Sequence, residues 1–288
     1  MSRSSRTRKA RTAEATAKVV TGAIALSVVA VAIFVFVYIV YNGIGALDWT
    51  FFSEGPRDRG REGGILPIIV GTLYLIGATA GLTLPIGVLA GVYLAEYAPR
   101  NFTTRAIRLA ITNMAGVPSI VYGLFGLAAF VLLAGFGRSI IAAALTLTCM
   151  TLPVVITATE EALRQIPQDL RQASLALGAT RLRTIYKVVL PAAAPGIITG
   201  AILGLARAAG ETAPILFTGA VFQMRRLPDG PSSQFMALPY HIYAQVTSVP
   251  GWNRELIWGT ALVLVLGVSI VSVMAAWWRS VQRRKVKW

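Results

Sequence analysis

Two ionisable side chains four residues apart, Arg207 and Glu211, interrupt a hydrophobic segment of this chain. An arginine fork binds an oxyanion in bidentate fashion. A neighbouring carboxylate repels a fully ionised anion but accepts a hydrogen bond from a P–OH group. The pair therefore favours a protonated oxyanion such as phosphate over sulfate. The alternative is an Arg–Glu pair that only neutralises itself and joins two helices.

The surrounding sequence places this pair inside a membrane. If the helix begins near Pro195, Arg207 lies about 18 Å along it, close to the middle of a hydrocarbon core about 30 Å thick. A charge at that depth costs at least ~2.5–3.5 kcal/mol and normally faces a cavity or a partner. Pro214 cannot donate to the carbonyl of Gly210. We therefore expect the helix to kink or loosen there and to turn free backbone groups toward a pathway.

A second polar group interrupts an earlier hydrophobic run. Pro118 frees the carbonyl of Met114, and the neighbouring polar side chains are Asn113, Ser119 and Tyr122. We expect these side chains to line the same cavity as Arg207. In the alternative interpretation, Ser119 only caps a local proline kink.

A polar, basic loop carries a third pattern. Leu170, Ala173, Ser174 and Leu177 fall on one helical face, and Gly178 suits a helix C-cap. A second face follows the glycine, made of Leu182, Ile185, Tyr186 and Val189. Two short helices hinged at a glycine form a rigid knob that can seat in a partner's groove and transmit a push. The alternative is an interfacial amphipathic segment that rests on anionic lipid headgroups.

Composition identifies the class of protein that must position these residues. The chain is 55% hydrophobic and only 14% charged, with a mean hydropathy of +0.65. Runs without charge that are long enough to span a bilayer cover residues 19–47, 63–95, 109–137, 139–159, 188–206 and 256–278. We expect an all-α integral membrane protein with six transmembrane helices. The first run is longer than a signal-peptide core, so we expect it to be retained as an anchor.

Basic residues indicate the orientation. Of the 27 lysines and arginines, 19 lie in alternate connections of the six-span topology, including both ends of the chain. The positive-inside rule places these connections, and both termini, in the cytoplasm. The formal charge of +15 is mainly this signal together with attraction to membrane lipid, and we expect no nucleic-acid partner.

Other residue types exclude several functions. Cys149 and His241 are the only cysteine and histidine, so the chain can form neither an internal disulfide nor a Cys/His metal cluster. It carries no Walker-type phosphate loop and no catalytic constellation. We expect a non-catalytic subunit with no cofactor of its own. A membrane-embedded enzyme and a passive channel are the alternatives from other classes.

Small residues at four-residue spacing mark two helices for close packing. Gly87 and Gly91 form one Gly-x-x-x-Gly pattern, and Gly196, Gly200 and Gly204 form two more in tandem. Such faces let another backbone approach closely. Packing inside one subunit is the simpler interpretation, and a seam between two subunits is the alternative.

The basic loop resembles the EAA loop of ABC importer permeases, which reads Glu-Ala-Ala, three residues, Gly, nine residues, Ile, one residue, Leu-Pro. Its Gly178 and Leu190-Pro191 stand in register. Gln172 replaces the Glu, Ala173 is retained, Ser174 replaces the second Ala, and Val188 replaces the Ile. The three polar segments together resemble the permease subunits of the phosphate-specific ABC importer over residues 65–280. Within that family, Gly210–Pro214 and Leu238–Tyr243 are similar to the PstA branch.

The resemblance implies a fold, a set of partners and an activity. The fold is the type I ABC importer (MetI-like) core, in the cytoplasmic membrane. The partners are a PstC-like second permease, two copies of a PstB-like ATPase that binds ATP and Mg²⁺, and a PstS-like external phosphate-binding protein. The activity is phosphate import by alternating access, with Arg207 and Glu211 in the pathway. Molybdate or sulfate is the alternative substrate.

Five segments summarise the expected organisation. Residues 1–18 form a basic cytoplasmic tail without regular structure, and residues 19–64 an accessory transmembrane helix with an external loop. Residues 65–280 form the transport domain, whose coupling loop covers residues 160–191. Residues 281–288 form a second basic cytoplasmic tail. The external loop 225–255 is rich in Pro and Gly, so we expect one short helix there at most.

Overall fold

The computed structural model describes residues 3–222, 224 and 226–285, and this part of the chain is almost entirely helical. Five helical segments are long and apolar enough to cross a membrane: Ala13–Ala46, Leu66–Tyr97, Ile140–Arg164, Arg181–Ala209 and Arg254–Val281. A sixth span is formed only if the bent pair Phe102–Ala115 and Ser119–Leu133 is counted as one. The expected all-α membrane architecture is therefore confirmed, and its third span is broken.

The transport core is built around one central helix, α6 (Ile140–Arg164). It packs against α3 (Leu66–Val92) on one side and α9 (Leu190–Ala209) on another. A Cβ atom at Gly87 or Gly91 of α3 would collide with Val155 or Thr159 of α6. A Cβ atom at Gly196 or Gly200 of α9 would collide with Ala162 or Ala158 of α6. The small-residue faces thus bring helices of the same subunit together, as the simpler interpretation predicted.

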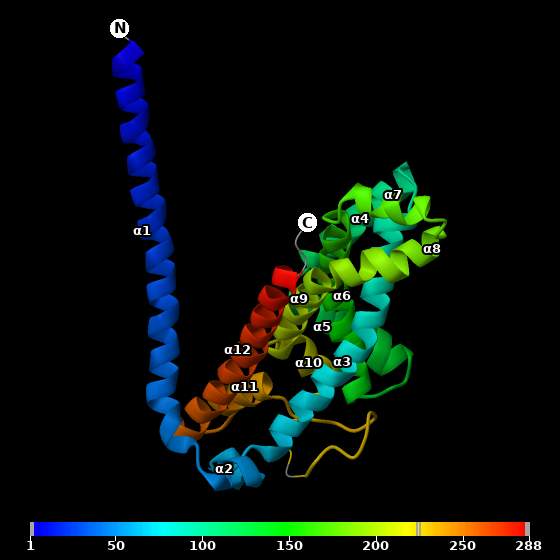
Figure 1. The fold of residues 1–288 in the computed structure, drawn as a ribbon. Helices are drawn as coiled ribbons and strands as arrows, with labels where there is room; N and C mark the ends of the chain where they lie inside the picture. The colour runs from blue at the N-terminus through cyan, green and yellow to red at the C-terminus, as the bar shows by residue number, and fades with distance from the viewer. Residues whose placement is uncertain (1–2, 223, 225, 286–288) are drawn as a thin grey trace.

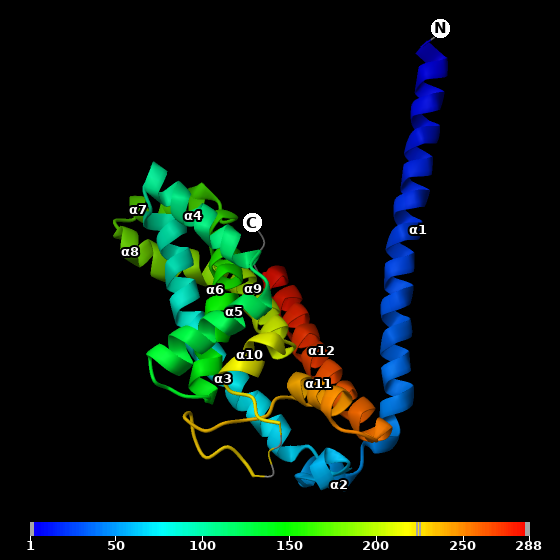
Figure 2. The same cartoon turned by 180° about the vertical axis from the view of Figure 1, so that it is seen from behind.

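The first helix, α1 (Arg3–Gly43), stands apart from this core (Figures 1 and 2). It contacts α12 (Arg254–Lys285) near its lower end, where the rings of Tyr38 and Trp258 meet edge to face at 5.3 Å. The expectation of an unstructured tail over residues 1–18 is wrong for the described residues, which are helical from Arg3. An alanine-rich sequence and the Glu14–Lys18 ion pair at 2.7 Å favour continuation of the helix.

The third predicted span is not one kinked helix. Residues 109–137 divide between α4 (Phe102–Ala115), α5 (Ser119–Gly126) and a π-helical turn (Leu127–Leu133), with a bend of 102° between the two halves. Gly116 ends α4, and Pro118 disfavours helical geometry at the residue before it. The two halves are therefore separate helices, joined by a three-residue turn.

The lower end of the molecule in Figure 1 gathers the short elements. They are α2 (Trp49–Ser53), a two-stranded antiparallel hairpin of β1 (Pro56–Arg57) and β2 (Glu62–Gly63), and α11 (Leu238–Ser248). Arg61 bridges the hairpin to the segment before α12 by donating to the carbonyl of Pro250. Within the described part of residues 225–255, α11 is the only complete helix, as predicted.

The opposite end carries the start of α1, the end of α12, and the two short helices α7 (Gln168–Ala176) and α8 (Arg181–Thr184) (Figure 1). The predicted second tail, residues 281–288, is helical as far as Lys285, and its last three residues lie outside the described part of the chain. The described parts of the basic segments that the positive-inside rule assigns to one side of the membrane thus lie at one end of the molecule.

Candidate functional site

The basic loop folds into a knob made of α7, α8 and the π-helical turn Ile185–Val189. Gly178 ends α7 with a φ of +80°, a conformation that favours glycine. Its N–H donates to the carbonyl of Leu175, and the N–H of Ala179 donates to the carbonyl of Ser174. These two bonds form a Schellman motif, so the glycine hinge expected from the sequence is a fixed turn.

Apolar side chains on the knob point into solvent. Leu177 is 89% exposed, and Leu175, Leu182 and Tyr186 are also exposed. Gln172 and Ala173 are exposed beside them. An exposed apolar patch on a rigid, polar-rimmed element is typical of a docking surface.

One predicted face of the knob is wrong. Leu182 and Tyr186 are exposed, whereas Ile185 and Val189 are buried together with Thr184. The cause is the π-helical turn, which adds a residue to the turn and rotates the following side chains away from α-helical register.

The knob is fastened to the end of α3 by an ion pair. Arg171 Nη2 donates to Glu96 Oε1 at 2.8 Å and to the carbonyl of Leu163 at 2.8 Å, while Nη1 donates to the carbonyl of Ile166. The two side chains are only 13% and 10% exposed. The Ser174 and Thr184 hydroxyls lie 2.9 Å apart and tie α7 to α8. Sequence patterns did not single out Glu96 or Arg171, although Glu96 is the only acid in the basic segment 96–108.

The Leu190-Pro191 step joins the knob to α9. Leu190 is half-buried against an apolar cluster that includes Leu163, Ile166 and Val189, while Pro191 is exposed. α9 continues directly from the π-helical turn, so no loop separates the knob from α9.

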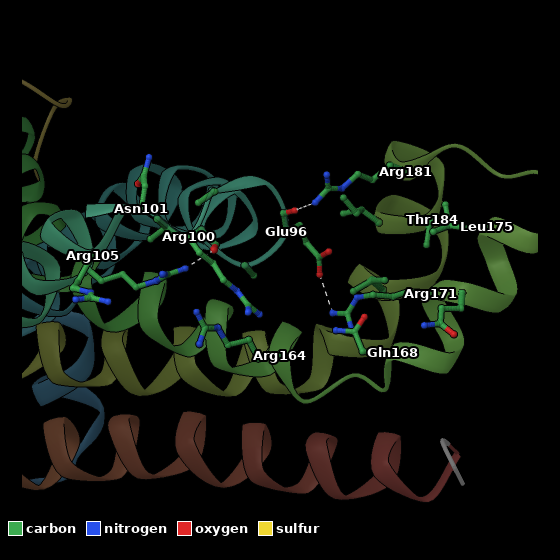
Figure 3. Close-up of a pocket in the computed structure, with 17 residues that line it drawn as sticks. Glu96, Arg100, Asn101, Arg105, Arg164, Gln168, Arg171, Leu175, Arg181 and Thr184 are labelled. Atoms are coloured by element: carbon green, nitrogen blue, oxygen red, sulfur yellow. Dashed lines mark hydrogen bonds and ion pairs between the residues drawn. The ribbon is translucent and has the colours of Figure 1, made fainter. Parts of the chain in front are cut away.

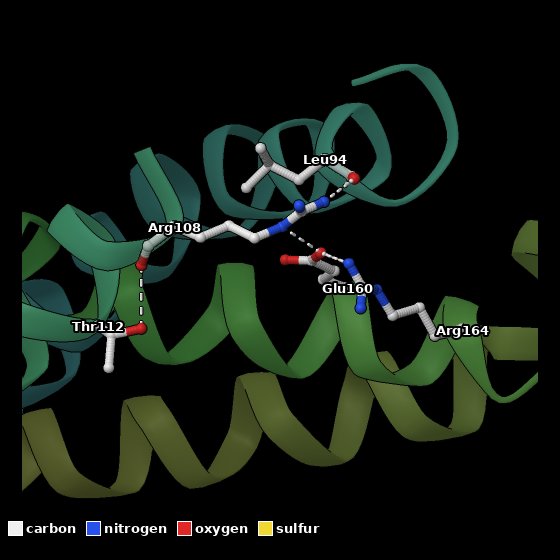
Figure 4. A network of polar contacts seen from close by, with 5 residues as sticks. All are labelled: Leu94, Arg108, Thr112, Glu160 and Arg164. Carbon is white, nitrogen blue, oxygen red and sulfur yellow. Dashed lines mark hydrogen bonds and ion pairs between the residues drawn. The ribbon is translucent and has the colours of Figure 1, made fainter. Parts of the chain in front are cut away.

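A second network joins α4 to α6 at the same end (Figure 4). Glu160 Oε1 accepts from Arg108 Nε at 2.8 Å and from Arg164 Nη2 at 2.6 Å. Arg108 Nη2 also donates to the carbonyl of Leu94 at 2.7 Å, in the π-helical turn Tyr93–Tyr97 that ends the α3 span. Arg108 therefore links α4 to α6 through Glu160 and to the α3 span through the carbonyl of Leu94.

Arg207 and Glu211 face each other across the end of α9. Arg207 Nε lies 3.5 Å from Glu211 Oε1, and their side chains are 56% and 17% exposed. Gly204 approaches Val154 and Val155 near the middle of the 25-residue α6. Arg207 follows Gly204 by less than one turn, so it lies within the membrane-crossing part of the molecule.

The backbone beside this pair is broken. α9 ends at Ala209, and the short α10 (Ala213–Thr218) begins after three residues, with Pro214 in its first turn. The break is sharper than the kink predicted at Gly210.

The start of α9 also differs from the prediction. The helix begins at Leu190 and contains Pro195, whereas the sequence predicted a start near Pro195. A proline in the early part of a helix removes only one backbone hydrogen bond. Packing of Ala193 and Ile197 against α6 outweighs that loss.

Two of the other predicted pathway residues, Ser119 and Tyr122, lie on α5, which packs against the start of α10. α5 packs on α10, because a Cβ atom at Gly123 would meet the carbonyl of Ala213 and the backbone of Pro214. Within the described part of the chain, no hydrogen bond or ion pair joins the Ser119 or Asn113 side chain to Arg207 or Glu211.

Tyr122 also explains how the broken span is capped. Its hydroxyl donates to the carbonyl of Met114 at 2.8 Å, across the turn between α4 and α5. Ser119 makes no capping bond at the start of α5, so the alternative that Ser119 caps the kink is wrong. The Tyr122 side chain is longer than that of Ser119, so it reaches the carbonyl of Met114 from a position about one turn further along α5.

Comparison with known proteins connects these features. The model of a family described as binding-protein-dependent transport system inner membrane component matches residues 87–288. A probable ABC transporter permease protein, YqgI of Bacillus subtilis (strain 168), is 37% identical and covers 91% of this chain and 94% of its own. The phosphate transport system permease protein PstA 1 of Mycobacterium tuberculosis (strain ATCC 25618 / H37Rv) is also 37% identical, over 82% of this chain and 76% of its own.

Solved structures support the fold. An inward-facing form of the MetNI methionine ABC transporter gives a TM-score of 0.58 at 20% identity, covering 75% of this chain and 96% of the matched chain. A bacterial ABC transporter involved in the import of alginate gives 0.55 at 12% identity, covering 81% and 82%. At these identities the likeness shows the arrangement of helices alone.

Proposed function

This chain belongs to the family of binding-protein-dependent transport system inner membrane components, and we propose that it is a permease subunit of an ATP-driven phosphate importer. It is a multi-pass, non-catalytic membrane subunit with a MetI-like fold. Permeases of this family work with an ATPase and a binding protein. The observation that carries phosphate as the substrate is 37% identity to a phosphate permease over 82% of the chain.

The Arg207–Glu211 pair supports the same substrate by its chemistry. The guanidinium offers a bidentate fork to an oxyanion, and Arg207 is more exposed than Glu211. The carboxylate disfavours a fully ionised anion but accepts a hydrogen bond from a protonated one. This combination favours phosphate over sulfate at the same site.

The knob around Gly178 receives the driving force. ATP and Mg²⁺ bind the partner ATPase, and this chain holds neither. Closure of the ATPases pushes on the exposed face that includes Gln172, Ala173 and Leu177. The Schellman turn keeps the knob stiff, and Leu190 passes the movement to α9, which carries Arg207. Alternating access follows as α9 rocks against its neighbours.

The proposed complex contains a PstC-like second permease, two PstB-like ATPases and a PstS-like external binding protein. The knob and both ends of the chain face the cytoplasm, where the ATPases lie. The hairpin and α11 face outward, toward the binding protein. The complex resides in the cytoplasmic membrane.

Uptake of labelled phosphate by the reconstituted complex tests the proposal. Arg207→Gln should abolish uptake while the complex still assembles, because glutamine keeps a polar side chain but lacks the charge and the guanidinium fork. Arg138→Gln is the matched control, since Arg138 is an exposed arginine outside the site. Near-normal uptake by Arg207→Gln would overturn the role of Arg207. Competition by molybdate or sulfate at equal concentration would overturn phosphate as the substrate.

A further inference from the structure

A second group of arginines surrounds a cavity at the knob end of the molecule, away from Arg207 (Figure 3). The cavity has a volume of about 900 Å³ and lies between the end of the α3 span, α4, α6 and the knob. Six arginines line it: Arg100, Arg105, Arg108, Arg164, Arg171 and Arg181. The lining contains one carboxylate, Glu96.

The ion pairs described above leave much of this charge uncompensated. Glu96 is bound to Arg171, and Glu160 outside the lining is shared by Arg108 and Arg164. Arg181 donates to the backbone carbonyl of Glu96 and lies over the ring of Tyr97, and within the described residues it pairs with no carboxylate. Six positive charges thus meet two carboxylates. Guanidinium groups gathered around one cavity repel one another unless an anion enters.

Two of the six arginines are free to bind. The side chains of Arg100 and Arg105 make no hydrogen bond or ion pair with other residues in the described part of the chain. In contrast, Arg108 and Arg171 are fixed by their carboxylates and by backbone carbonyls. The fixed pair forms the frame of the cavity, and the free pair supplies unoccupied donors.

The surroundings favour a phosphate group. Arg100 and Asn101 immediately precede α4, a 14-residue helix whose N-terminus adds positive potential. Figure 3 shows Arg100 and Arg164 reaching toward the same space from different elements. Guanidinium forks converging from several sides match the oxygens of a phosphate better than the single charge of chloride.

We propose that this cavity is a second anion site, which binds a phosphate group on the side of the protein that carries the knob. The phosphate group comes either from free phosphate or from the headgroup of an anionic lipid. Exposed apolar residues on α4, such as Phe102 and Leu109, place the cavity near a lipid surface. Gln172 and Leu175 of the knob also line it, so an occupant touches the element that receives the driving force.

The test is site-resolved modification of arginines with phenylglyoxal in the complete complex, read by mass spectrometry. In phosphatidylcholine nanodiscs, inorganic phosphate at about ten times its Kd should slow modification of Arg100, Arg105 and Arg164 about tenfold. Acetate at equal ionic strength should not. If a lipid headgroup is the source, phosphatidylglycerol in the nanodisc should give this protection without added phosphate.

Substitutions distinguish a specific anion site from nonspecific attraction of phosphate to a positively charged surface. Protection of Arg164 should be lost in the double variant Arg100→Gln/Arg105→Gln, whose two side chains are exposed and tie no elements together. It should persist in Arg183→Gln, an exposed arginine on the knob that does not line the cavity. Equal protection by acetate, protection of Arg183 as strong as that of Arg100, or no protection in either nanodisc would each overturn the site.

The same experiment distinguishes phosphate binding in the cavity from transport past Arg207. Arg207→Gln should abolish uptake and leave protection of Arg100 unchanged. Loss of cavity protection with normal uptake would leave the proposed function standing. Normal uptake in Arg207→Gln with intact cavity protection would remove only the pathway role.

Discussion

The molecule contains two arginine sites with opposite charge balance. In the membrane, Arg207 stands against Glu211 at 3.5 Å, and the two charges nearly cancel. At the knob end, six arginines surround a cavity whose lining holds one glutamate. A balanced site binds an anion weakly and releases it, as a transport pathway requires. An unbalanced site retains an anion. The comparison indicates that the neighbouring carboxylate, more than the arginine, determines whether a site releases an anion or retains it.

Glu211→Gln should have the largest effect on this contrast, because it makes the pathway resemble the cavity. We expect phosphate uptake to fall at least tenfold, about 1.4 kcal/mol, since the anion is held more tightly and released more slowly. Wild-type uptake should decline as pH rises and dihydrogen phosphate loses one of its two P–OH protons and gains a second negative charge, whereas the variant should lose this preference. Initial rates across pH measure both effects. A variant with the wild-type rate and pH profile would contradict the contrast.

Glu160→Gln should increase the difference in charge balance between the two sites by making the cavity more positive. The substitution removes the carboxylate that neutralises Arg108 and Arg164. We expect phosphate to bind the cavity about fivefold more tightly, or about 1 kcal/mol. The melting temperature should fall, because the link between α4 and α6 is lost. Phenylglyoxal protection and thermal unfolding are the measurements, with the exposed Glu161→Gln as control. Unchanged or weaker phosphate binding would count against the charge argument.

Added salt should affect the cavity more than the pathway. Exposed charges are screened over about 10 Å at 0.1 M ionic strength, whereas charges inside the membrane are screened much less. Raising sodium chloride severalfold should weaken phosphate protection of Arg100 about threefold, with the phosphate concentration for half-maximal uptake changing less. An equal salt response at both sites would show that they are not electrostatically distinct.

Gly178→Ala should leave both anion sites intact and weaken only their connection to the ATPase. Alanine at a φ of +80° costs about 1 kcal/mol, although no neighbouring atom blocks its Cβ. We expect transport-coupled ATP hydrolysis to fall about threefold with unchanged protection of Arg100. Ala176→Gly, in the last turn of α7, is the matched control for helix stability. Normal coupling in Gly178→Ala would show that the Schellman turn is not needed.

Local patterns in the sequence predicted the features that depend on local physics. Charge-free runs located the spans, and the spacing around Gly178 predicted the hinge, because both depend on neighbouring residues. Glycines four residues apart predicted close helix packing, which the structure shows between α9 and α6 and between α3 and α6. The 102° bend was underestimated, since the chain needed Tyr122 to cap the carbonyl of Met114.

The features that the sequence could not predict depend on distant contacts. Glu96 and Arg171 lie 75 residues apart and meet only when α7 folds back on the end of the α3 span. The arginines of the cavity come from four separate segments, and each looked like an ordinary positive-inside residue. The rotated face at Ile185 followed from a π-helical turn, which hydrophobic spacing does not signal.

The solitary position of α1 has a consequence for how the protein is made. α1 is synthesised before the other described helices, yet its main helix contact in the folded chain is with α12, which is synthesised after them. During translation α1 must therefore wait in the bilayer as an independent helix, solvated by lipid on every side. Ribosome-bound chains that stop before Trp258 should leave Tyr38 accessible to lipid-phase crosslinkers. Release of the completed chain should reduce that crosslinking, because Trp258 then packs against the Tyr38 ring.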